Sequence, residues 1–355
     1  MQPSHDKTNN FDFLRLAAAT AVLLSHQFAL SGQPEPLFLY SSWGGLGVLV
    51  FFAISGYLVA GSWARDPHPW RFLMRRLLRI WPGLAVAAVV IAFVMGPLVS
   101  TLGTAEYFSS PLTWAYLKLL GLWTFEVQLP GIFLGNPHPL GANGSLWTIP
   151  IEVKCYVLLA LVGTFGFMRR NGLVFVLSFI ALAFWFFFLF KISYENPLRM
   201  KIQMGVVFFS GVCLSVLRPY WLAHRRWFAV LASLAIVSLW FGGWNDVAMT
   251  LGLPIATVVV GSWATPVLRR VGRFGDVSYG VYIYAFPVQQ TVIWATGNRL
   301  SVLEGACVAI PITVGLAFLS WHAVEQPALR LKQHLGGRLR DRAAPGPVPH
   351  TPARP

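Results

Sequence analysis

The chain has 355 residues, of which 56% are hydrophobic and only 11% are charged, and its mean hydropathy is +0.60. Soluble domains carry about 25% charged residues, so the composition excludes a water-soluble globular domain, and an aromatic content of 15% excludes a disordered chain. Lys and Arg outnumber Asp and Glu by 27 to 13, but the basic residues stand between long apolar runs, which indicates a polytopic membrane protein rather than a nucleic-acid-binding one.

Ten apolar segments predict the fold. A helix needs about 20 apolar residues to cross the hydrocarbon core of a bilayer. The sequence therefore predicts an all-α fold, a polytopic bundle of about ten transmembrane helices. The spans are expected at 12–30, 44–63, 82–102, 147–166, 173–190, 203–217, 227–242, 248–265, 278–296 and 302–321. The first run follows a polar stretch and ends without a small-residue cleavage site, which favours a retained span over a signal peptide.

The joints between these segments predict their orientation, because cytoplasmic joints carry an excess of Lys and Arg. With ten spans, the strongly basic joints and both termini lie in the cytoplasm. The residues concerned are Arg65, Arg71, Arg75, Arg76, Arg79, Arg169, Arg170, Arg218, Arg225, Arg226, Arg269, Arg270 and Arg273. One external joint, 191–202, is an exception with three basic residues.

An eleventh apolar segment, 112–127, is shorter and carries Lys118 and Glu126. Counting it as a span would place the later basic joints outside. We therefore expect 103–146 to be an external excursion with an interfacial or re-entrant helix at its middle. Residues 1–330 are expected to form one integral-membrane domain, and the basic stretch 331–355 a disordered cytoplasmic tail.

The first predicted helix, FDFLRLAAATAVLLSHQF, carries polar side chains that a bilayer disfavours. Arg15 and His26 are eleven residues apart, roughly three turns and about 16 Å along the axis, and they share one face. Each alone is explained by an interfacial position. The pair on one face favours a functional site, with Asp12 as a further, substrate-binding candidate.

The second span and the joint after it add three candidates. In FFAISGYLVAG, Ser55 and Gly56 indicate close helix packing, and Ser55 is also a substrate-binding candidate. In RFLMRRLLRIWP, Arg76 and Arg79 share a face, and guanidinium groups bind phosphates bidentately. Because this joint holds five arginines, one or two are expected to be functional and the others to anchor the helix at lipid headgroups.

The segment GSLWTIPIEVKCYVLL places Glu152 about 8 Å inside the external end of its helix, a depth similar to that of His26. We therefore expect the two side chains to meet in one cavity, where the carboxylate orients the imidazole and strengthens it as a base. A pair between Glu152 and Lys154 is a weaker alternative, because residues two apart do not share a helical face. Trp147 and Lys154 are substrate-binding candidates.

The segment DVSYGVYIYAFPVQQ brings several hydroxyls and amides into a span. Tyr279 is a candidate for binding the donor and Tyr282 for binding substrate, while interfacial aromatic belts explain some of these tyrosines without chemistry. Glu325, at the cytoplasmic end of the last span, is expected to be a structural partner for an arginine rather than a catalyst. The three cysteines show no metal-ligand spacing, so no metal is expected.

In their order and spacing, these motifs resemble the membrane-bound acyltransferase family 3. The resemblance runs from Asp12 to Pro327 and rests on FDFLRLAAATAVLLSH, GVLVFFAISGYL, RRLLRIWP, SLWTIPIEVKCY, SYGVYIYAFPV and VEQP. It implies an O-acyltransferase that moves an acyl group, commonly acetyl, from cytoplasmic acyl-CoA to a hydroxyl of a carbohydrate or another small acceptor.

The resemblance also implies roles for particular residues. It places an essential histidine at His26, its paired arginine at Arg15, an Arg-x-x-Arg pattern on Arg76 and Arg79, and a buried glutamate at Glu152. The chain departs from the family pattern at two positions, where many relatives have a histidine and a glutamine. These positions hold Ala285 and Lys154, so a mechanism with a second histidine is in doubt and His26 carries more of the chemistry.

The expected mechanism follows from these positions. Arg76 and Arg79 hold the phosphates of acyl-CoA at the cytoplasmic face, and the pantetheine arm threads inward until the thioester approaches His26. His26 acts either as a general base on the acceptor hydroxyl, oriented by Glu152, or as a covalent acyl-histidine relay. The residues leave both open.

Two other classes of function are weaker alternatives. A transporter or flippase for a sugar or lipid-linked sugar is the main one, because it too needs intramembrane Arg, His and Glu as a proton relay. The cytoplasmic arginine cluster and the lack of an internal repeat argue against it. A non-catalytic assembly factor for polysaccharide export ranks last. The expected partners are acyl-CoA, a carbohydrate acceptor (a surface polysaccharide, an exopolysaccharide or a lipid-linked sugar) and membrane lipid, with no nucleic acid, in a bacterial inner membrane.

Overall fold

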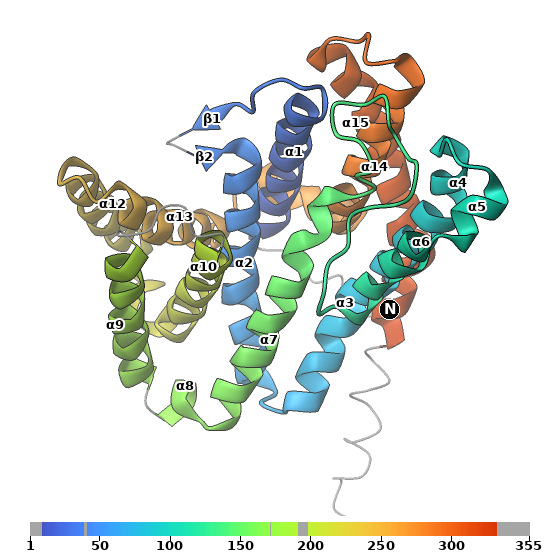
Figure 1. Cartoon of the computed structure of the whole chain (residues 1–355). Helices are drawn as coiled ribbons and strands as arrows, with labels where there is room; N and C mark the ends of the chain where they lie inside the picture. The colour runs from blue at the N-terminus through green and yellow to red at the C-terminus, as the bar shows by residue number, and fades with distance from the viewer. Residues whose placement is uncertain (1–8, 39–40, 171, 191–197, 332–355) are drawn as a thin grey trace, which may run out of the picture.

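A computed structural model describes residues 9–38, 41–170, 172–190 and 198–331 of the chain (Figure 1). Helices make up almost all of this structure. Its sheet is a pair of two-residue antiparallel strands, β1 (Leu37–Phe38) and β2 (Ser41–Ser42). The all-α class predicted from the sequence is confirmed. The predicted tail, 331–355, lies outside the described residues except for its first residue.

Each of the ten predicted segments overlaps one long helix, and 82–102 also includes the π-helical turn and short helix that follow α3. The long helices are α1 (Phe11–Leu30), α2 (Trp43–Arg65), α3 (Pro69–Val90), α7 (Ile149–Thr164), α9 (Gly172–Phe190), α10 (Leu198–Val216), α12 (Arg225–Phe241), α13 (Asn245–Gly261), α14 (Ser278–Thr296) and α15 (Val302–Ser320). A π-helical turn, Ile91–Met95, and the short α4 (Gly96–Val99) continue α3, a 3-10 turn, Gly144–Thr148, precedes α7, and a second π-helical turn, Trp321–Glu325, follows α15. The remaining short helices are α5 (Thr104–Ser109), α6 (Pro111–Tyr116), α8 (Phe167–Arg170), α11 (Arg218–Trp221) and the 3-10 helices Leu117–Gly121 and Leu268–Phe274.

Six helical stretches of the described chain are long and apolar enough to cross a membrane. They are Phe11–Leu30, Trp43–Arg65, Pro69–Val99, Gly144–Thr164, Leu198–Val216 and Val302–Leu331. Two further apolar helices, Gly172–Phe186 and Asn245–Gly261, are shorter. These helices indicate an integral membrane protein, whereas the count of ten spans and the cytoplasmic termini stay predictions.

Helix α2 lies between α1 and α10 in the middle of the molecule (Figure 1). Glycines let α2 and α10 approach closely. A Cβ atom on Gly56 would lie 1.9 Å from the backbone oxygen of Phe208, and one on Gly211 would lie 2.4 Å from that of Ala53. The close packing predicted for Gly56 is therefore confirmed, and it fixes the face of α2 that carries Ser55.

The excursion 103–146 folds back along α3. At one end, the amide of Thr101 donates to the carbonyl of Gly131 at 3.0 Å. At the other, the indole of Trp81 donates to the carbonyl of Leu120 at 3.1 Å. Trp81 lies on α3 and Thr101 lies just beyond α4, twenty residues later, so the hairpin follows the helical stretch Pro69–Val99 for about 30 Å. Figure 1 shows α6 beside α3. The segment 112–127 is helical only as far as Gly121 and then turns back.

Candidate active site

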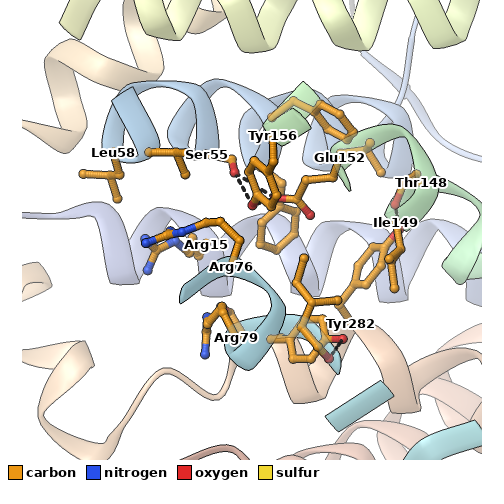
Figure 2. A pocket seen from close by; sticks show the side chains of 17 residues that line it. Arg15, Ser55, Leu58, Arg76, Arg79, Thr148, Ile149, Glu152, Tyr156 and Tyr282 are labelled. Carbon is orange, nitrogen blue, oxygen red and sulfur yellow. Dashed lines mark hydrogen bonds between the residues drawn. The ribbon is translucent and has the colours of Figure 1, made fainter. Parts of the chain in front are cut away.

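Five helices enclose a pocket at the centre of the bundle (Figure 2). It contains about 830 Å³ of space, a volume that includes the part open to solvent. Helices α1, α2, α3, α7 and α14, with the turn before α7, line it. The lining residues are Arg15, Val48, Phe51, Phe52, Ser55, Leu58, Val59, Arg76, Arg79, Ile80, Thr148, Ile149, Glu152, Tyr156, Ser278, Tyr279 and Tyr282. Arginines gather at one end, and Thr148 and Tyr282 lie toward the other (Figure 2).

A single carboxylate joins two of the pocket's arginines. Asp276, just before α14, accepts hydrogen bonds from Arg15 at 2.9 Å and from Arg79 at 2.6 Å. Its other oxygen accepts one from Ser278 at 2.5 Å. Arg15 also pairs with Asp12 at 2.9 Å. Sequence reasoning missed Asp276, although this residue opens the polar DVSYG motif. The joint that contains Asp276 is interpreted through its basic residues, which hide the single carboxylate.

Arg79 has further partners that hold it in place. Its guanidinium lies 3.6 Å from the Glu325 carboxylate, which is only 1% exposed. The guanidinium carbon also lies over the rings of Tyr279 and Trp321, at 5.8 and 5.7 Å from their centroids. The prediction that Glu325 serves as a structural partner for an arginine is confirmed.

Arg76 differs from its two neighbours. Among the described residues it has no ion-pair partner, and its buried Nε atom donates no hydrogen bond. Figure 2 shows it between Arg15 and Arg79 at the same end of the pocket. A partly buried guanidinium whose buried Nε donor is unused is suited to binding an anionic ligand.

The other arginines of the basic cluster face the corner between α2 and α3. Arg71 donates from Nε to Asp66 at 3.0 Å, and Arg75 donates to the same carboxylate. These hydrogen bonds, with that of Arg71 the largest cause, lower the pKa of Asp66 well below its usual range. Arg71 and Arg75 therefore anchor the corner, and Arg76 and Arg79 are the cluster members that reach the pocket.

Glu152 projects from α7 into the middle of the pocket. It accepts a hydrogen bond from Ser55 at 2.7 Å and another from Tyr156. The hydroxyls of Ser55 and Tyr156 also lie 2.8 Å apart. Both hydroxyls bind the same carboxylate oxygen, Oε1. The expected contact between Glu152 and His26 is not present among the described residues, because Glu152 lies in the pocket and His26 lies outside its lining.

His26 lies just beyond the pocket rather than in its lining. Its Nδ1 atom is 3.4 Å from the hydroxyl of Ser145, and Phe286 meets its ring edge-on with centroids 5.4 Å apart. The carboxylate that interacts electrostatically with His26 is Glu35, in the loop after α1, which accepts a hydrogen bond from Ser25. Sequence reasoning missed Glu35 because it lies outside every predicted span.

Tyr282 lines the pocket and also bonds to Ser145, the residue that contacts His26. Its hydroxyl donates to the carbonyl of Ser145 at 2.5 Å and lies 2.7 Å from the hydroxyl of Thr148. The side chain of the same Ser145 contacts His26 on the other side.

The remaining predicted residues take different positions. Tyr279 lines the pocket and donates to the carbonyl of Ile80 at 2.7 Å. Asp12, Trp147 and Lys154 do not line it: Asp12 pairs with Arg15, Trp147 packs against the main hydrophobic core, and Lys154 is exposed, 5.2 Å from the centroid of the Trp123 ring. Within the described residues, no three His, Cys, Asp or Glu side chains group as metal ligands.

The chain is similar to several characterised sequences. The model of a family described as an acyltransferase domain matches residues 8–322. An O-acetyl transferase of Shigella phage Sf6 is 34% identical over 334 residues, which cover 90% of this chain and 96% of the phage protein. Nodulation protein 10 of Rhizobium leguminosarum bv. viciae is 28% identical and covers 95% of this chain and 99% of its own length.

A third relative is longer than this chain. It is a Bacillus subtilis (strain 168) protein whose name gives peptidoglycan O-acetyltransferase as a provisional activity, and it is 24% identical over 82% of this chain and 51% of its own length. No solved structure matches the chain.

Proposed function

The chain belongs to the membrane-bound acyltransferase family 3, and from this premise we propose that it moves an acetyl group from acetyl-CoA to a hydroxyl of a carbohydrate. Family membership makes the protein an acyltransferase and decides against the transporter alternative. The observation that carries the choice of donor is Arg76, a pocket guanidinium that forms no ion pair with a carboxylate among the described residues.

The donor side of the proposal is supported by the shape of the pocket. Coenzyme A carries anionic phosphates at one end and a thioester at the other end of its pantetheine arm. The phosphates bind at the arginine end, where Arg76 has unused donors. The arm then passes Glu152 and Ser55, and the thioester reaches the end formed by Thr148 and Tyr282.

The acceptor side is supported by the position of His26 and by the relatives. His26 lies beyond Tyr282, near the Glu35 loop and the end of the excursion at Ser145. Two of the relatives are named for O-acetyl transfer, one of them to peptidoglycan. A carbohydrate hydroxyl that enters from this side meets the imidazole, while the donor occupies the pocket.

The reaction follows as general base catalysis. His26 takes the proton of the acceptor hydroxyl while the acceptor oxygen forms a bond to the thioester carbonyl carbon. The carbon–sulfur bond breaks, and the proton passes from the imidazolium to the leaving thiolate. The products are an O-acetyl ester and free coenzyme A. A covalent acetyl-histidine intermediate is the second route, and donor alone would then label the enzyme.

The donor is expected to enter from the cytoplasm and the acceptor from the opposite side of a bacterial inner membrane. This assignment rests on the basic joints, including the arginine cluster beside the pocket. The same assignment agrees with the proposed binding of coenzyme A at the arginine end of the pocket and of the sugar on the side of His26.

Transfer of radiolabel tests the proposal. Membranes that contain the protein should move label from [acetyl-¹⁴C]acetyl-CoA into the glycan fraction, and mass spectrometry of that glycan should show an acetyl increment that depends on the gene. His26→Ala should abolish both signals at normal expression. Label transfer that persists in His26→Ala would exclude both chemical routes, and glycans unchanged by loss of the gene would exclude the carbohydrate acceptor.

A further inference from the structure

We infer that Tyr282 is a positioning residue that closes the donor pocket toward His26 and keeps acceptor-side water away from the thioester. The inference rests on the proposed function and adds to it a barrier between the two substrates. The hydrogen bonds and packing of Tyr282 carry the argument.

The position of Tyr282 is that of an end wall. On one side its ring and Thr148 line the pocket. On the other side its hydroxyl donates to the carbonyl of Ser145, whose side chain contacts His26. Tyr282 and Ser145 therefore stand between the pocket and the imidazole.

Both ends of the Tyr282 side chain are held. The ring is buried and meets Phe51 in an edge-on contact with centroids 5.8 Å apart. The hydroxyl has the Ser145 carbonyl as acceptor and the Thr148 hydroxyl as a second partner. Since rotation of the ring away from the wall breaks both hydrogen bonds, the wall stays closed unless a ligand displaces it.

A closed wall has a direct chemical use. A thioester is open to attack by water, and a site that excludes water suppresses this side reaction. Entry of the acyl group toward His26 displaces the Tyr282 hydroxyl from Ser145, so that the passage opens as the thioester fills it.

The rate of donor hydrolysis in the absence of acceptor measures how well Tyr282 keeps water from the thioester. Purified protein in nanodiscs is given acetyl-CoA alone, and release of the coenzyme A thiol is followed. In hydrolysis, water forms a bond to the carbonyl carbon, the carbon–sulfur bond breaks, and acetate and the free thiol result. Tyr282→Ala, which loses the ring and both hydrogen bonds, should raise this release at least about tenfold over the wild type.

A matched variant distinguishes loss of the Tyr282 barrier from general destabilisation of the protein. Tyr284 lies on the same helix, is equally buried at 8% exposure, and does not line the pocket. Tyr284→Ala should leave thiol release at the wild-type rate. Tyr282→Phe keeps the ring and loses both hydrogen bonds, so its release should fall between those of the wild type and Tyr282→Ala. Equal release from the wild type and Tyr282→Ala would overturn the inference, as would an equal rise in Tyr284→Ala.

A second measurement does not depend on activity. In a variant whose three cysteines are replaced by serine, Ser55→Cys places a thiol on the pocket wall. A membrane-impermeant maleimide added to spheroplasts should label it slowly while Tyr282 is present and at least about tenfold faster in Tyr282→Ala. Equal labelling overturns the barrier even if acetyl transfer is confirmed. Faster labelling of this variant, combined with no acetyl transfer by the wild-type protein, supports the barrier and refutes the proposed function.

Discussion

The three arginines of the pocket differ in how their charge is balanced. Arg15 and Arg79 share the carboxylate of Asp276, and Arg79 also lies beside Glu325. Arg76 has neither of these partners. A ligand phosphate therefore competes with an ion-paired carboxylate at two of the arginines, whereas at the third it competes only with the longer-range attraction of Glu152.

Replacing Arg76 should weaken binding of the donor. Arg76→Gln is expected to raise the KM for acetyl-CoA about 10- to 100-fold, the effect of losing a charge-assisted hydrogen bond, with a smaller change in kcat. Arg76→Lys keeps the charge but not the bidentate geometry, so its KM should lie between that of the wild type and that of Arg76→Gln. Arg71→Gln, in the same cluster but bound to Asp66, is the matched control and should leave the KM unchanged. An equal rise in both glutamine variants would mean that the cluster acts only through its net charge.

Removing the charge of Asp276 should destabilise the pocket. Asp276→Asn leaves Arg15 and Arg79 without their common carboxylate, so we expect a loss of about 2–3 kcal/mol in the free energy of unfolding. Thermal unfolding in detergent measures this loss, and Asp276→Glu, which keeps the charge, should recover part of it. If the melting temperature of Asp276→Asn equals that of the wild type, Arg15 and Arg79 do not need the Asp276 carboxylate for stability.

The residues that sequence reasoning placed correctly and incorrectly differ for a physical reason. Arg15 and Arg76 line the pocket as predicted, because an arginine inside or beside a span must face the bundle interior or the headgroups. The partnership of Glu152 with His26 was predicted from depth along two helices. Depth does not fix the direction in which a side chain points, and Ser55 on α2 meets the carboxylate instead. Glu35 reaches the His26 region through a loop, whose path the helical pattern does not contain.

At the scale of single elements, the corner between α2 and α3 is held by one carboxylate. Asp66 accepts hydrogen bonds from Arg71 and Arg75, which lower its pKa well below the usual range. A lowered pKa in the folded state contributes stability above the unfolded value, about 3.9, and this contribution is lost as the pH falls through the folded pKa.

The corner should therefore show a defined pH dependence. Between pH 5 and pH 7, Asp66→Asn should have a lower melting temperature than the wild type by a constant amount. The two melting temperatures should converge only well below about pH 4, where the wild-type carboxylate takes up its proton. A gap that closes at higher pH would show that the arginines do not hold the carboxylate ionised.

The end of the excursion is attached to α14 by amide side chains. Asn136 donates to the side-chain oxygen of Gln290 at 2.9 Å, and Gln290 donates to the carbonyls of His138 and Gly141 at 2.8 and 3.0 Å. These bonds hold the chain that leads to Ser145 and hence to His26.

Gln290→Ala should release this chain. It removes three hydrogen bonds, each worth about 1 kcal/mol, so amide hydrogen exchange in 132–143 should become faster and acetyl transfer slower. Gln203→Ala removes a single amide contact, to Thr250, elsewhere in the bundle and serves as the control. Faster amide exchange in 132–143 without any loss of acetyl transfer would show that the attachment of this segment to α14 is not needed for catalysis.

At the scale of the whole molecule, the elements could be predicted and their contacts could not. Each apolar run became one helix because a chain in lipid must satisfy its backbone hydrogen bonds within the segment. The hairpin along α3 depends on contacts between distant residues, such as Trp81 with Leu120. Such contacts leave no periodic signal, so the sequence supports a non-spanning excursion only through the charges on either side of it.

Those charges make the orientation testable. With ten spans, a cysteine introduced at Gly103 lies outside, and one introduced at Ala223, in the basic joint after α10, lies inside. An impermeant maleimide added to spheroplasts should therefore label the first and not the second. If 112–127 crossed the membrane, the order would reverse for every joint after it, and Ala223→Cys would be labelled. The same outcome would place Arg225 and Arg226 outside, against the charge rule.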